Sequence, residues 1–242
     1  MSRIAAAYAA ARGRTGLVPF VVAGYPSPEA SLEMLRGFAR QGALAAEIGV
    51  PFSDPIADGP DIQRASENAL ERGADVSTAL DLVAALRRES EMPVVLMSYA
   101  NPVLRGGVDR FAARARAAGL DGVLLSDLPP DEAPDVWSAR LDLLLRRARG
   151  FVYCLSRTGV TGQGGGFRGP LAERITAVRR RSSLPVAVGF GISTAQDARA
   201  LVGVADAVVV GAAFMRAAAA GANGGAVERV LALSSELIEA LS

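Results

Sequence analysis

The sequence predicts an α/β fold of the TIM-type (β/α)8 barrel class. Short runs of Val, Leu and Ile alternate with amphipathic stretches along the 242 residues, which is typical of parallel strands covered by helices. An open doubly wound sheet would show the same alternation, but no G-x-G-x-x-G opens a helix after the first strand. Polar motifs instead follow the ends of strands along the whole chain, as they do in barrel enzymes. We therefore expect one barrel domain spanning residues 1–242.

Seven segments are predicted to be buried strands because each is a continuous apolar run that ends at a glycine, proline or polar residue. In order they are residues 17–23, 45–50, 93–99, 121–126, 150–156, 185–190 and 205–210. Proline cannot donate to a ladder, so Pro51 and Pro55 end the second strand and stiffen the loop after it. A closed barrel of this type has eight strands, so the count predicts that one strand–helix unit is missing or rearranged.

Helices are predicted where apolar residues recur at helical spacing between the strands. In order they are residues 2–14, 28–40, 63–72, 76–89, 109–118, 170–181, 194–202 and 228–240. Ser27 or Ser31 caps the second of them. In the short segment 133–150, a helix over 140–149 with basic residues at its C-terminal end is the simplest interpretation, and a strand over 141–145 is the alternative.

The composition excludes several classes of function. The net charge is +1, which favours neither nucleic acid nor an anionic membrane as a partner. Cys154 is the only cysteine, and histidine and lysine are absent, so His-based triads, His or multi-Cys metal sites and Schiff-base chemistry are excluded. The N-terminus has no signal-peptide pattern and no apolar run reaches membrane-spanning length, so we expect a cytoplasmic protein.

The most informative stretch runs from Glu47, in the second predicted strand, to Asp58 in the loop that follows. A carboxylate in an apolar strand is costly to bury unless it is paired or works as a neutral acid. A structural ion pair or N-cap would explain Glu47 about equally well. Asp54 and Asp58, in a loop stiffened by proline and glycine, favour a functional site instead.

Three glycine motifs follow the last three predicted strands: Thr161-Gly162, Gly189-Phe190-Gly191 and Gly211-Ala212. Each alone is typical of a turn. Together they match the way that barrels present backbone N–H groups and helix N-termini to a phosphate, and Ser193-Thr194 at a helix start fits that use. Residues 163–169 have the composition of a mobile lid or of a disordered linker.

The motifs EIGVPFSDPIADGPDIQRAS, VPFVVAGYP, MSYANP, SDLPPDEA, FVYCLSRTGVTG, PVAVGFGIS and ADAVVVGAA together resemble the tryptophan synthase alpha chain family. They span almost the full length in the family's order. The resemblance implies a (β/α)8 barrel that cleaves indole-3-glycerol phosphate to indole and glyceraldehyde 3-phosphate, with no metal or organic cofactor of its own. It also implies a beta-chain partner in an α2β2 hetero-oligomer, to which the indole passes.

The resemblance also implies roles for individual residues. Glu47 would shuttle a proton to the indole ring and from the substrate hydroxyl, and Asp58 would stabilise the positive charge at the ring nitrogen. Asp54 would lie at the partner interface. The implied substrate-binding residues are Phe20, Leu96, Tyr99, Asp127, Tyr153 and Phe190, and the implied phosphate-binding residues are Gly162, Gly191, Gly211 and Ala212.

The sequence departs from the family at two places. Ala212 stands where the family usually has serine, and residues 133–150 are too few for the helix, strand and further helix that the family has there. The chain could be a truncated, weakly active homologue, its strands could close by rearrangement, or a partner could complete the wall. The competing functions are a catalytically weak subunit that regulates a beta chain, another phosphate-sugar enzyme, and a phosphate-binding barrel without catalysis.

Overall fold

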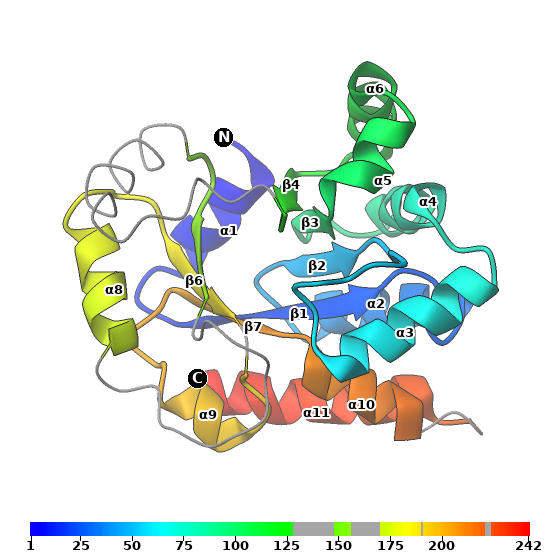
Figure 1. Ribbon diagram of the computed structural model, residues 1–242. Helices are drawn as coiled ribbons and strands as arrows, with labels where there is room; N and C mark the ends of the chain where they lie inside the picture. The colour runs from blue at the N-terminus through cyan, green and yellow to red at the C-terminus, as the bar shows by residue number, and fades with distance from the viewer. Residues whose placement is uncertain (128–147, 156–169, 190, 221–223) are drawn as a thin grey trace.

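The computed structural model describes residues 1–127, 148–155, 170–189, 191–220 and 224–242 (Figure 1). Every strand in these ranges belongs to one parallel sheet with the order β4-β3-β2-β1-β7-β6-β5. The strands are β1 (Gly16–Val22), β2 (Ala46–Gly49), β3 (Val94–Ser98), β4 (Gly122–Leu125), β5 (Val152–Leu155), β6 (Val186–Gly189) and β7 (Ala207–Val210). The seven predicted strands are therefore confirmed: β1 is shifted by one residue toward the N-terminus, and the other six have slightly narrower bounds.

The helices alternate with the strands. They are α1 (Arg3–Ala10), α2 (Pro28–Arg40), α3 (Pro60–Glu71), α4 (Val76–Arg87), α5 (Ala100–Arg105), α6 (Val108–Ala118), α8 (Pro170–Arg179), α9 (Ala195–Arg199), α10 (Ala212–Ala220) and α11 (Ala226–Leu241). Ser27 is the cap of α2, since its side chain accepts a hydrogen bond from Ala30 N at 3.2 Å. Ser31 is not a cap, because it lies inside the helix and is buried.

Two helices, α5 and α10, were not expected from the sequence. Asn101-Pro102 suggests a turn, but proline is tolerated in the first turn of a helix, where its missing N–H has no acceptor to satisfy. The alanine-rich α10 has little alternation between polar and apolar residues, yet alanine has the highest helix propensity. Propensity, rather than periodicity, was the signal for α10.

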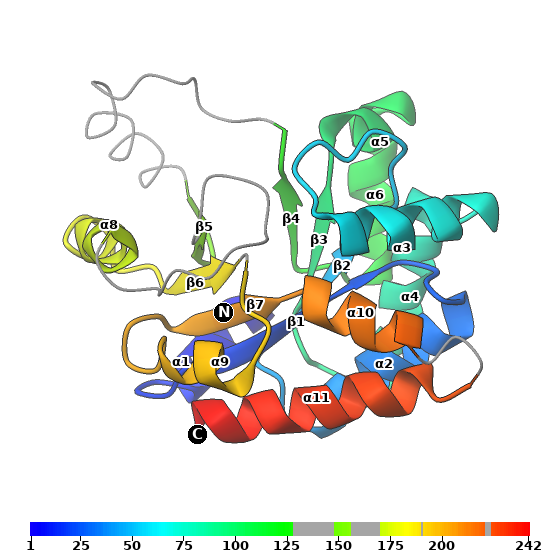
Figure 2. The same cartoon turned by 60° about the horizontal axis from the view of Figure 1, so that its bottom comes forward.

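The first and last strands along the chain, β1 and β7, are neighbours in the sheet. β1 pairs with β7 from Gly16↔Ala207 to Pro19↔Val210, and with β2 on its other side. This pairing brings the two ends of the chain together, as the closure of a barrel requires. The sheet curls with helices outside it (Figure 2), and β4 and β5 are its edges. Along the chain, residues 128–147 come between β4 and β5 and are not among the described residues. The helix and strand interpretations of 140–149 therefore lie largely outside the described part of the chain.

The main core lies between the sheet and the helices that cover it. α11 packs against α2, α9 and α10, and Figure 2 shows these helices lying together below β1 and β7. The rings of Phe38 on α2 and Phe214 on α10 are both fully buried, with their centroids 5.3 Å apart. Because aromatic side chains bury the largest apolar areas, this pair ties the N-terminal and C-terminal parts of the chain together.

The N-terminal helix α1 is held at the end of the sheet where the strands begin. Asp121, just before β4, accepts hydrogen bonds from Val94 N at 2.9 Å, from Arg87 at 3.0 Å and from Arg3 at 3.2 Å. This carboxylate is almost buried and therefore needs its charged partners. It joins α1, α4, β3 and β4 at that end. No helix within the described ranges is long and apolar enough to cross a membrane.

Phe38→Ala should lower the free energy of unfolding by about 3–5 kcal/mol, because it leaves a cavity against Phe214. Urea unfolding followed by circular dichroism measures this change. Leu104→Ala is the control, since Leu104 is 58% exposed and its truncation should change the value by less than about 0.5 kcal/mol. Similar small losses for both variants would show that the Phe38–Phe214 contact does not anchor the core.

Candidate functional site

Glu47 lies in the middle of β2, on the face that points into the curl of the sheet. Its Cα is in register with Phe20 on β1 and Val95 on β3, so strands flank it on both sides. The side chain is 3% exposed, and its Oε1 atom has no hydrogen-bond partner within the described part of the chain. Burial, and to a smaller extent the neighbouring Asp58, raise the pKa of the Glu47 carboxyl to about 8.

These features argue against the interpretation of Glu47 as a structural ion pair. A structural carboxylate in a strand would be paired with a cation, but no ion pair of Glu47 exists among the residues that the structure describes. At neutral pH the group is therefore mostly a neutral acid, as the functional interpretation requires.

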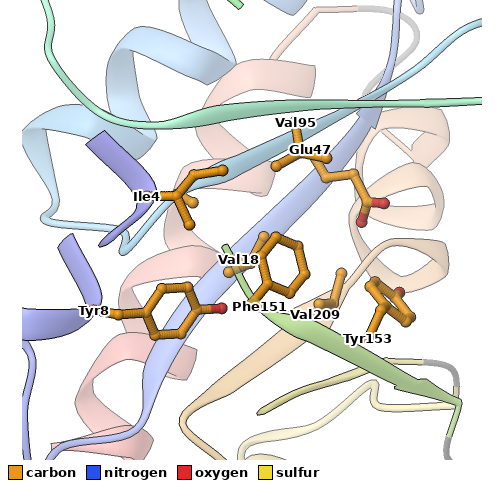
Figure 3. Close-up of a pocket in the computed structure, with 9 residues that line it drawn as sticks. Ile4, Tyr8, Val18, Glu47, Val95, Phe151, Tyr153 and Val209 are labelled. Carbon is orange, nitrogen blue, oxygen red and sulfur yellow. The ribbon is translucent and has the colours of Figure 1, made fainter. Parts of the chain in front are cut away.

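A small cavity of about 10 Å³, close to the volume that holds one water, lies beside Glu47 inside the curl of the sheet (Figure 3). Its walls are mostly apolar side chains from the strands, together with two side chains of α1. The lining residues are Ile4, Tyr8, Val18, Ala45, Glu47, Val95, Phe151, Tyr153 and Val209. Helix α1 thus closes the space next to Glu47 and contributes to the burial that raises its pKa.

Asp58 lies in the loop between β2 and α3, two residues before the helix begins. Its Oδ2 accepts a hydrogen bond of 3.1 Å from the hydroxyl of Tyr99, which directly follows β3. Burial raises the pKa of Asp58 to about 6, and the hydrogen bond from Tyr99 opposes that rise. At pH 7 Asp58 is therefore mostly ionised while Glu47 is mostly protonated, so one buried pair supplies both an acid and an anion.

Tyr153 on β5 belongs to the same site. Burial and then the charges of Glu47 and Asp58 raise the pKa of its phenol well above the ordinary value. Figure 3 shows its ring and the Glu47 carboxylate on the same side of the cavity. The ring lies over Gly189 on β6, where a Cβ atom would stand 2.1 Å from the phenol oxygen. Glycine at position 189 is therefore what leaves room for Tyr153.

Phe20 on β1 also depends on glycine. A Cβ atom on Gly49 would lie 2.4 Å from the Phe20 ring, and one on Gly211 would lie 3.0 Å from it. The ring thus stands between the ends of β2 and β7, and the Cα of Phe20 is in register with that of Glu47. The structure thus brings together five sequence-predicted residues from the strands and the loops that follow them: Glu47, Asp58, Phe20, Tyr99 and Tyr153.

Other predicted binding residues are placed differently. Leu96 lies on the opposite face of β3 from Val95, because side chains alternate along a strand, so it faces the helices rather than Glu47. Met97, whose Cα pairs with Gly49, shares the inward face and fills the expected position better. Asp127 follows β4 and accepts a hydrogen bond of 2.8 Å from Ala100 N. Phe190 and Gly162 lie outside the described residues.

The expected phosphate end is formed by the segments after β6 and β7. Gly191 has a φ of 79°, which favours glycine. The amides of Ser193 and Thr194 are each 3.0 Å from the carboxylate of Asp197, which completes a capping box with the N-cap residue Thr194, so they are not free for a phosphate as the sequence suggested. Helix α10 begins at Ala212 directly after β7, and the first amides of a helix have no acceptor within it. This helix start is the better place for an anion.

Asp54 lies apart from the buried pair, on the exposed side of the same loop. It lines a groove of about 630 Å³ between this loop, α4, α5 and α6. The groove combines an apolar floor with three arginines, and its residues include Phe52, Asp54, Leu80, Asn101, Pro102, Arg105, Arg110, Phe111 and Arg114. No group of three or more potential metal ligands occurs in the described segments.

Comparisons with known proteins identify the family. The model of the tryptophan synthase alpha chain family matches residues 6–139 and 133–241. The tryptophan synthase alpha chain of Burkholderia multivorans is 44% identical over 263 residues, covering 100% of this chain and 97% of the relative. That of Laribacter hongkongensis is 45% identical over 260 residues, covering 99% and 97%.

Solved structures agree. The tryptophan synthase of Mycobacterium tuberculosis matches with a TM-score of 0.85 and 35% identity over 99% of this chain and 98% of that one. The tryptophan synthase subunit alpha of Legionella pneumophila matches with a TM-score of 0.84 and 33% identity, covering 100% and 98%. The fold is therefore that of an alpha-chain TIM barrel.

The comparisons also bear on the short segment. The alignment with the Burkholderia chain takes 263 positions for the 242 residues here, a difference of 21. The two parts matched by the family model meet at residues 133–139, between β4 and β5. The two matches thus meet within the segment where the sequence departs from the family, and the chain, matched on both sides of it, belongs to the tryptophan synthase alpha chain family.

Proposed function

We propose that this chain is a lyase that cleaves indole-3-glycerol phosphate to indole and glyceraldehyde 3-phosphate as the alpha subunit of a tryptophan synthase. One observation carries the residue assignment within this reaction. Glu47 is buried, Asp58 beside it is partly buried, and their pKa values of about 8 and about 6 give them opposite protonation states at pH 7. Pairs of carboxyl groups with separated pKa values divide acid and base roles.

The reaction breaks the bond between C3 of the indole ring and the glycerol chain. Protonated Glu47 gives its proton to C3, and the ring becomes a cation with its charge on the nitrogen. The ionised Asp58 carboxylate stabilises that charge. Glu47, now a carboxylate, takes the proton of the hydroxyl on the adjoining carbon. The O–H electrons form the aldehyde carbonyl, and the electrons of the broken C–C bond return to the ring as indole.

The remaining assignments follow from position. Phe20, Met97 and Tyr153 surround Glu47 with apolar and aromatic surface suited to a flat indole ring. The phosphate binds at the start of α10, where Gly211 brings the backbone close and the free amides supply hydrogen bonds. Neither a metal nor an organic cofactor takes part, since the two carboxyl groups complete the proton transfers.

A beta chain docks on the groove that Asp54 lines. The groove combines apolar side chains with arginines and two carboxylates, Asp54 and Asp75, which is typical of a protein interface. It adjoins the loop that carries Asp58, so docking there would affect the same loop that holds the catalytic carboxylate. A cytoplasmic location is consistent with a chain that takes a phosphorylated metabolite as substrate.

A second candidate function is a catalytically weak subunit that binds and regulates the beta chain. Two features favour it: the shortening between β4 and β5, and Ala212 in place of a serine. The buried pair of Glu47 and Asp58 opposes it, since a purely regulatory subunit has no use for an unpaired carboxyl in a strand.

Indole release from indole-3-glycerol phosphate tests the first proposal against the second. The purified chain should release indole, and adding a tryptophan synthase beta chain should raise the rate strongly. Glu47→Gln keeps the shape but removes the ionisable group, so turnover should fall by about 100-fold or more. A folded wild-type chain that releases no indole under either condition would favour the regulatory function.

The stability of the protein should report the neutral state of Glu47. The pKa of Glu47 in the folded protein, about 8, lies above the ordinary value of 4.5. The contribution of Glu47 to the free energy of unfolding is therefore full below pH 4.5 and is lost as the pH rises through 8. Glu47→Gln removes this dependence. The free energy of unfolding of Glu47→Gln minus that of wild type should therefore increase by about 3–5 kcal/mol from pH 4.5 to pH 8.5.

Urea unfolding at several pH values measures that difference. Glu29→Gln is the control, because hydrogen bonds from its own backbone N–H and from Ser27 lower the pKa of Glu29 and it does not titrate in this range. A Glu47→Gln curve parallel to wild type from pH 4.5 to 8.5 would mean that Glu47 is ionised in the folded protein.

Ala212→Ser should strengthen substrate binding. A hydroxyl at the first position of α10 can donate to the phosphate, and a hydrogen bond to a charged group contributes about 1.5–3 kcal/mol. The KM for the substrate should therefore fall about tenfold or more, with kcat little changed. Ala219→Ser, near the exposed far end of the same helix, is the matched control. An unchanged KM would place the phosphate away from α10.

A further inference from the structure

We propose that Tyr99 is the positioning residue for Asp58: its phenol fixes the loop of residues 51–59 to the end of β3 and keeps the Asp58 carboxylate ionised. This inference deepens the proposed function and rests on it for its kinetic consequence. It rests on contacts of the Tyr99 side chain for its physical basis.

The phenol oxygen of Tyr99 makes two hydrogen bonds with adjacent residues of this loop. It accepts one of 2.9 Å from Ala57 N and donates one of 3.1 Å to Asp58 Oδ2. Because the Ala57 amide takes an acceptor site on the oxygen, the phenol proton is left to point at the carboxylate. The direction of donation is therefore set by the backbone.

The ring of Tyr99 contacts the other end of the same loop. It packs against the ring of Phe52, with the centroids 5.0 Å apart and the planes tilted by 31°. Tyr99 thus contacts the loop where it leaves β2 and where it approaches α3. Its backbone position is itself fixed, because it directly follows β3 and its neighbour Ala100 donates to Asp127 after β4.

The groups around Asp58 make this hydrogen bond important for its charge. Glu47 from β2 and Tyr153 from β5 interact with Asp58 electrostatically, and neither bears a positive charge. From α3, Gln63 donates to the backbone oxygen of Asp58 at 2.8 Å rather than to its carboxylate. Within the described residues, the phenol of Tyr99 is the donor that reaches the Asp58 carboxylate.

The Tyr99 phenol also stays protonated throughout the pH range in which Asp58 and Glu47 titrate. Burial and the Asp58 charge raise the pKa of Tyr99 far above its ordinary value, although Ala57 and Ser126 act against the rise. Tyr99 can therefore donate to Asp58 at every pH at which Asp58 is ionised. Its effect on Asp58 has a definite sign, because a donor to the charged form lowers the pKa of a carboxyl.

Tyr99→Phe tests the inference, because it removes the hydroxyl and keeps the ring that packs on Phe52. Carbon-13 NMR of labelled aspartate carboxyls, with the Asp58 signal assigned from an Asp58→Asn sample, measures the pKa without any substrate. The pKa of Asp58 should rise from about 6 by about one unit. Tyr25→Phe is the matched control, since Tyr25 lies after β1 and has no hydrogen bond to Asp58.

The sign of the shift separates positioning from a merely structural role. If Tyr99→Phe only loosened the loop, water would reach Asp58 and its pKa would fall toward 3.8. A lowered or unchanged pKa in a folded variant would overturn the inference. Thermal unfolding monitored by circular dichroism establishes that the variant is folded.

The pH profile of indole release gives the kinetic consequence. The acid limb of kcat/KM, set by Asp58, should move up by the same one unit in Tyr99→Phe, while the basic limb set by Glu47 stays near pH 8. An equal loss at all pH values, with no moved limb, would contradict the inference. A raised Asp58 pKa in a chain that releases no indole would support the inference and overturn the proposed function.

Discussion

The burial of one carboxyl group, that of Glu47, determines much of this structure. β2 is paired on both sides, and residue 47 faces the mostly apolar interior of the curled sheet, where its neighbours in register are Phe20 and Val95. An ionised carboxylate without a cation is too costly there. The group is therefore held as a neutral acid, and α1, which closes the cavity beside it, belongs to the site although it lies at the opposite end of the barrel from the loops.

Glycines at the ends of strands give that interior its shape. Gly49 and Gly211 make room for Phe20, and Gly189 makes room for Tyr153. The same lack of a side chain at Gly211 lets the backbone approach a ligand at the start of α10. Glycine thus makes room for the aromatic rings and also leaves the backbone accessible at the proposed phosphate site. This explains why single substitutions at these glycines would disturb rings on neighbouring strands.

The sequence predicted the strands well, because continuous apolar runs are strong local signals, and a lone strand carboxylate was enough to make Glu47 a candidate. It predicted contacts across the structure less well. Leu96 and Met97 are adjacent and both apolar, and only the register with β2 shows that Met97 faces Glu47. Ser193 and Thr194 resemble an anion site until Asp197 is seen to accept from both amides. The spacing of Thr194 and Asp197 is that of a capping box, and this local pattern was the signal that these amides already have an acceptor.

The shortened segment bears on the wall of the barrel more than on its chemistry. Glu47, Asp58, Tyr99 and Tyr153 come from β2, β3 and β5 or the loops that follow them, and the candidate phosphate end follows β7. The alignment with the Burkholderia chain is 21 positions longer than this chain, and the two parts matched by the family model meet between β4 and β5, where the described strands leave two edges. A shortening there changes how the barrel closes and leaves each of these groups on its own paired strand. For this reason the buried acid–anion pair is stronger evidence for catalysis than the shortened segment is against it.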